Sequence, residues 1–179
     1  KAEDVLRRVK EEHERIRREI KRVIDDVRRK HKEILDRLRE EIKRVEELLR
    51  KILEDVERDG KRDDRLRRLA EELKKRLDDV KRDVEEKEKE NRRRLEKEEK
   101  RLEENFKRNE ERLRRIEEEG PVREEVVKEL EDNVKRNEED AKRTVEKLRK
   151  NLEDNRREVE KIVRDLRRLV EKAREDVKR

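Results

Sequence analysis

The sequence predicts an all-α protein, a single-chain antiparallel up-down-up three-helix bundle of long, nearly straight helices. Its 179 residues include only two Gly, one Pro and one Thr, and no Ser or Gln, so the chain lacks the turn residues that sheets require. The two glycines divide it into three nearly equal parts. In the first part, apolar residues recur with the period of an α-helix.

The first expected helix covers about residues 2–58, and its apolar face continues from Ala2 to Val56. The separation of 54 positions between these two residues is covered in 15 steps, or 3.6 residues per step, and the face includes His13 and His31. A continuous apolar face has to be buried, which argues against a disordered chain and against a free-standing charged helix. The same average corresponds to an 18-residue repeat over five turns, which predicts helices without a supercoil.

The second helix is expected over about 63–118 and the third over about 121–178, with turns at Gly60 and Gly120. Glycine just past a helix end is the usual C-terminal cap, and Pro121 suits the first turn of the third helix. Because these turns are short, neighbouring helices should be antiparallel. We expect one domain over 1–179.

Composition excludes several classes of function. The net charge is +6, but each third of the chain carries +2 with both signs interleaved, and Phe106 is the sole aromatic residue, so we expect no nucleic-acid partner. No apolar run approaches the roughly 18 residues of a membrane span, and we expect neither a membrane segment nor a signal peptide. The chain has no Cys, and hence no disulfide or thiolate site.

A catalytic site is not expected either. Thr144 is the one aliphatic hydroxyl, and the many carboxylates lie at helical spacing among Lys and Arg, where ion pairing along the helix explains them. Glycine-rich phosphate loops are missing from the sequence. We therefore predict a non-enzyme with no cofactor, no metal site and no small-molecule substrate.

The most specific feature is a set of neutral polar residues in pairs 18 residues apart. In an antiparallel hairpin, His13 is level with residue 107 and His31 with residue 89. The parallel third helix, offset by 120 residues, brings Asn133 and Asn151 to the same two heights. The sequence thus predicts a first polar layer of His13, Asn105, Asn109, Asn133 and Asn137, and a second polar layer of His31, Asn91, Asn151 and Asn155.

A fully hydrogen-bonded polar layer penalises helices that slide or pair wrongly, so the leading interpretation is that the layers specify helix register. A second interpretation makes the two histidines proton sensors, because their unperturbed pKa is about 6.5. A metal site is the least favoured, since His13 and His31 are separated by roughly 27 Å along the helix and cannot share an ion.

The sequence resembles computationally designed helical bundles with a straight 18-residue repeat and buried His/Asn hydrogen-bond networks. The resemblance covers the whole chain and rests on the surfaces of Glu, Asp, Lys and Arg, the equal helix lengths, the two glycine turns and the paired His and Asn residues. It implies a synthetic coiled-coil-like scaffold. Members of that family serve as rigid scaffolds, assembly components, caged switches and pH-responsive oligomers, the last being richer in buried histidine.

We therefore expect a designed structural scaffold with no natural biochemical activity, soluble and monomeric, suited to cytoplasmic expression, with no cellular compartment indicated. The alternative is an interaction or switch module that responds to pH, exchanges a helix or assembles with itself. The middle third motivates this alternative, because it has 12 apolar residues against 19 and 17 in the others.

The predicted shape and mass can be measured in solution. Helices of about 57 residues at 1.5 Å per residue should give a scattering particle with a maximum dimension on the order of 90 Å. Light scattering should return the 22.5 kDa of one chain. A compact globular particle would contradict the long helices, and a multiple of this mass would favour assembly.

Overall fold

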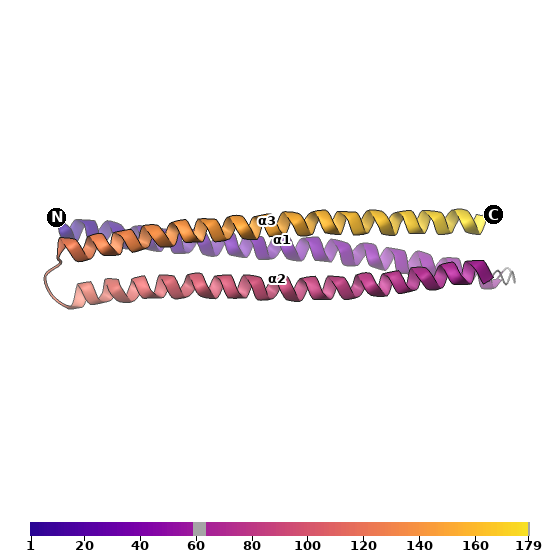
Figure 1. Ribbon diagram of the computed structural model, residues 1–179, viewed down its shortest axis with the longest axis horizontal. Coiled ribbons are helices and arrows are strands. Elements are labelled where there is room, and N and C mark those ends of the chain that lie inside the picture. Colours follow the sequence, from indigo (N-terminus) through magenta and orange to yellow (C-terminus); the bar gives the residue numbers. More distant parts are fainter. Residues whose placement is uncertain (59–63, 179) are drawn as a thin grey trace. The chain divides into compact units, whose positions relative to one another are not determined.

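The computed structural model describes residues 1–58 and 64–178, which form three α-helices and no strand (Figure 1). Helix α1 spans Ala2–Arg58, α2 spans Asp64–Glu118 and α3 spans Glu124–Lys178. All three helices contribute to the apolar cores, which confirms the predicted all-α three-helix bundle. The predicted turn at Gly60 and the predicted helix start at residue 63 lie outside the described residues.

The third helix begins three residues later than predicted. Gly120 has φ +111°, a conformation that suits glycine, and Pro121 lies in the connection rather than in the first helical turn. The first helical hydrogen bond runs from the Val127 amide to the Arg123 carbonyl, at 3.2 Å. The chain uses 119–123 to cross between two packed helices, which lie 8–10 Å apart in bundles, before α3 can start.

The helices are stable locally because their surfaces consist of strong helix formers with complementary charges. Exposed ion pairs join residues one turn apart, as between Arg15 and Glu19 or between Arg156 and Glu160. Each such pair adds only about 0.2–0.5 kcal/mol. Burial of the apolar faces must therefore supply most of the stability of helices this long.

The described chain divides into two compact units, each containing a part of all three helices. The first unit comprises Lys1–Arg29 and Arg92–Leu152, and the second comprises Lys30–Asn91 and Glu153–Arg179. Each unit has its own apolar core. The single domain over 1–179 and the straightness of the helices stay predictions.

Ion pairs between helices show the antiparallel direction of α1 and α2. In the first unit, Lys10 pairs with Glu117 and Arg28 with Glu99, so the partner number falls as the α1 number rises. Figure 1 shows the N-terminus at the same end of this unit as the start of α3, as an up-down-up arrangement requires.

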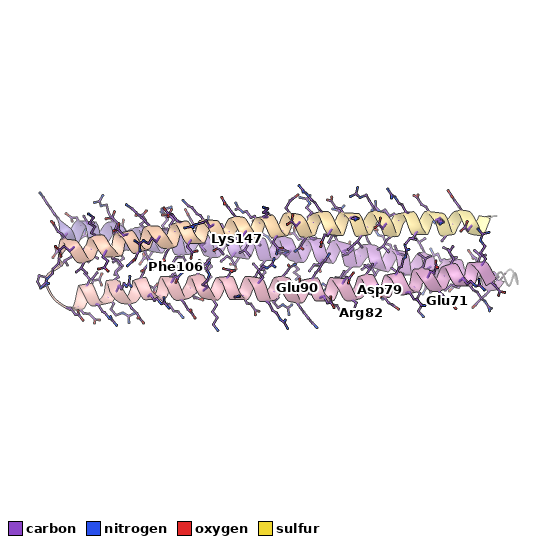
Figure 2. The ribbon with its side chains drawn as sticks, viewed as in Figure 1. Glu71, Asp79, Arg82, Glu90, Phe106 and Lys147 are labelled. Carbon is purple, nitrogen blue, oxygen red and sulfur yellow. The ribbon has the colours of Figure 1, made fainter. Side chains whose placement is uncertain are left out.

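The cores contain the apolar residues at helical spacing. In the first unit, Phe106 is buried together with Leu102 and Leu130, and Figure 2 shows Phe106 on the side of α2 that faces the other helices. In the second unit, Leu38 and Ala173 are fully buried. Polar side chains that lie on the same helix faces as these cores are buried too, and must either find hydrogen-bond partners or remain unpaired.

Candidate functional site

The second polar layer forms a hydrogen-bonded chain across all three helices of the second unit. The Asn155 amide nitrogen on α3 donates to Oδ1 of Asn91 on α2, at 3.0 Å. Nδ2 of Asn91 lies 3.3 Å from Nδ1 of His31 on α1. His31 and Asn91 are 5% and 8% exposed. Three of the four residues predicted for this layer are thus brought together.

The direction of this chain is coupled to the tautomer of the imidazole. An amide nitrogen can only donate, so Nδ1 of His31 must accept with its lone pair. In this orientation the imidazole proton lies on Nε2 of His31. Reversing the Asn91 amide alone would turn its NH₂ toward the NH₂ of Asn155, so the two amides can be reversed only together.

Asn151, the fourth residue predicted for this layer, is half-buried and belongs to the first unit. Its predicted position beside His31 stays a prediction.

The first polar layer is not the connected network that the sequence predicts. His13 is buried, and its ring meets the edge of Phe106 with centroids 5.8 Å apart and an interplanar angle of 69°. Its Nε2 lies 3.7 Å from Oε1 of Glu110, too far for a hydrogen bond. Among the described residues, Nε2 of His13 and Nδ2 of the buried Asn109 have no hydrogen-bond partner.

The physical reason is competition for acceptors. Glu110, the carboxylate nearest His13, forms a hydrogen-bonded ion pair with Arg17. Asn137 donates to the backbone carbonyl of Asn105, at 3.3 Å, instead of to a side chain beside the histidine. Asn105 and Asn137 are thus joined to each other across α2 and α3, and in the described part of the chain these bonds do not extend to His13 or Asn109.

A second cluster in the first unit was missed by the sequence analysis. Arg101 on α2 donates to Asp140 at 2.6 Å and to the hydroxyl of Thr144 at 2.7 Å, both on α3. Thr144 in turn donates to the Asp140 carbonyl at 2.9 Å, and Asn105 lies 3.5 Å from the Asp140 carboxylate. The hydrogen bond that Arg101 donates to the Asp140 carboxylate raises the pKa of the guanidinium, which stays charged.

A signal for this cluster was present in the sequence. Thr144 is the single Thr of a chain without Ser, and it is 5% exposed, so its hydroxyl needed a local partner. The Arg and Asp that complete the cluster could not be distinguished from the many other charged residues by composition alone.

Asn133, the remaining residue predicted for the first layer, is half-buried and lines an open pocket at the end of α2 and the beginning of α3. The structure places it beside Leu130 and Ile116 in that pocket.

Burial lowers the pKa of His13 below 6.5, because it disfavours the imidazolium. The negative charge of Glu110 opposes this shift, and Arg17 adds to it. Within residues 1–58 and 64–178, no group of three or more His, Asp or Glu side chains is placed to hold a metal ion. None of the described helices has an apolar stretch long enough to cross a bilayer.

The two buried asparagines of α2 offer a matched test. Asn91→Leu removes a hydrogen-bond partner of both His31 and Asn155, and should lower the free energy of unfolding by about 1–3 kcal/mol. Asn109→Leu removes a buried donor that has no partner, and should raise it by about 1 kcal/mol. Both are measured by chemical denaturation at pH 7.5. Equal losses in the two variants would contradict the different pairing of the layers.

In comparisons with known proteins, no family model, curated protein or solved structure matches this chain.

Proposed function

We propose that this chain is a structural scaffold of designed origin, whose buried polar residues specify how its helices pair, and that it has no natural catalytic activity. The observation that carries the proposal is the chain of hydrogen bonds from Asn155 through Asn91 to His31. It joins one residue of each helix in a single order.

A buried polar group affects the free energy of folding very differently when it is paired and when it is unpaired. A polar group that is paired in the correct register contributes little net stability, whereas the same group left unpaired in a slipped register costs about 1–3 kcal/mol. An apolar layer carries no such penalty, because Leu finds apolar neighbours in either register. The polar chain therefore supports a role in selecting one arrangement.

A cross-linking experiment tests this role, since the sequence has no Cys of its own. Arg39 on α1 forms an ion pair with Glu88 on α2, so cysteines at these two positions report the native register. Cysteines at Arg39 and Lys81 report a slip of two turns. A short bis-maleimide should link the native pair and leave the slipped pair unlinked.

The second polar layer is then replaced by His31→Leu, Asn91→Leu and Asn155→Leu together. We expect the slipped pair to become linked in this background, while Asn109→Leu, the control, leaves the native pattern unchanged. A triple variant that still links only the native pair would show that the polar layer does not select the register.

A pH-responsive module is the second candidate function, and His13 is the observation that favours it. The imidazole is 3% exposed and has no hydrogen-bond partner at Nε2 among the described residues. Protonation would place a charge in a buried position, where Glu110 on α2 is the nearest carboxylate and Arg17 on α1 opposes it.

The direction of the pH effect follows from the lowered pKa of His13. Between about 6.5 and that lower value, the unfolded chain binds more protons than the folded chain. The stability from this residue is therefore complete above about pH 6.5, and it is lost as the pH falls toward the folded pKa. His13→Asn should flatten this dependence.

Denaturation midpoints from pH 7.5 to 4.5 measure the effect as a difference between parent and variant, which cancels most of the carboxylate background. Glu117→Gln, which breaks the exposed ion pair with Lys10 and leaves His13 alone, is the matched control. Parallel curves for the parent and His13→Asn would rule out the proton-sensor function.

A further inference from the structure

An open pocket of about 530 Å³ lies in the first unit, between the last turns of α2 and the first turns of α3. The connection between the two helices closes one end through Glu119, Pro121 and Arg123. This volume falls within the roughly 300–1,000 Å³ that is usual for sites of small organic ligands.

One part of the pocket is cationic. Arg112 and Arg115 reach it from α2 and Arg123 from the connection. None of the three forms an ion pair within the described chain. By contrast, other arginines pair with a carboxylate on another helix, among them Arg17, Arg28, Arg39 and Arg101. Glu119 and Glu129 also line the pocket and leave it with one excess positive charge.

The other part of the pocket is apolar. Leu130 is buried and Ile116 is half-buried, and both pack in the core of the first unit. Val126 is 40% exposed, one of two large hydrophobic side chains left exposed in the described residues. Its exposure falls inside the pocket, so an apolar group bound there would cover surface that the protein itself leaves open.

We propose that this pocket is a binding site for a small organic anion with an apolar body, a medium-chain carboxylate. Its carboxylate would bind the guanidinium groups of Arg112, Arg115 and Arg123, which suit the geometry of a carboxylate. Its hydrocarbon chain would pack on Ile116, Val126 and Leu130. The Asn133 amide, which also lines the pocket, offers a further donor to the head group.

Charge and size favour this occupant over a second copy of the chain. One exposed valine beside three arginines is a small apolar patch, whereas a stable protein interface buries about 1,200–2,000 Å² in total. Two copies would also bring their unpaired arginines close to one another, which is unfavourable.

Three ligands separate the two parts of the site. Decanoate carries both the charge and the apolar chain, decanol carries only the chain, and acetate only the charge. Each is titrated below its aggregation limit into the full chain, and backbone amide NMR shifts of Ile116, Val126 and Asn133 give the dissociation constant. Decanoate should bind at least about tenfold more tightly than either of the other two.

The variant Arg112→Gln with Arg115→Gln should weaken decanoate binding by roughly tenfold or more. The matched control, Arg7→Gln with Arg8→Gln, removes the same charge from exposed positions of α1 in the same unit and should leave binding unchanged. Val126→Asn should weaken decanoate without affecting acetate.

Three results would overturn the proposal. Decanol binding as tightly as decanoate would show that the arginines play no part, and equal losses in the two double variants would show attraction to net charge alone. A doubling of the mass by light scattering without decanoate, reversed by Val126→Asn, would show that a second copy covers the pocket instead.

Discussion

Burial of one narrow apolar face on each helix is the interaction on which this protein depends. With 66% of its residues charged, the chain has little else to remove from water, and exposed ion pairs contribute at most about 1 kcal/mol each. Each fully buried Leu or Ile is worth about 1.5–3 kcal/mol. Every polar residue placed in that face therefore occupies a position at which an apolar residue would add stability, and it must be compensated by hydrogen bonds.

The fold was predictable from the sequence because one signal, the 3.6-residue period, governs the whole chain. Within the described residues, α1 spans the predicted range and α2 ends at the predicted residue, whereas the predicted start of α2 lies outside them. The start of α3 was missed because Pro121 is as compatible with a connection as with a first helical turn, and the distance between packed helices decides between them. Sequence periodicity contains no information about that distance.

The sequence predicted which positions carry the buried polar residues, but it predicted only some of the hydrogen bonds between them. The pairs 18 residues apart located His13, His31, Asn91 and Asn109 correctly as buried. Spacing along a helix says which residues share a face, but the choice of partner depends on which acceptors are already occupied. The Arg101–Asp140–Thr144 cluster shows the same limit, because its charged members have no distinguishing pattern in a chain made mostly of charges.

Positions that depart from the 18-residue repeat explain why one polar layer is hydrogen-bonded across the helices and the other is not. Asn109 and Asn137 are repeated as Asn91 and Asn155, but the residues around them are not repeated. The equivalents of Arg17 and Phe106 are Leu35 and Glu88, so the second layer has no arginine at the position from which Arg17 binds Glu110, and no aromatic ring at the position that meets His13. Asn91 is then free to donate to His31, whereas Asn109 is left without an acceptor. Hydrogen bonding in a buried layer is thus decided by its charged and aromatic neighbours as much as by the amides themselves.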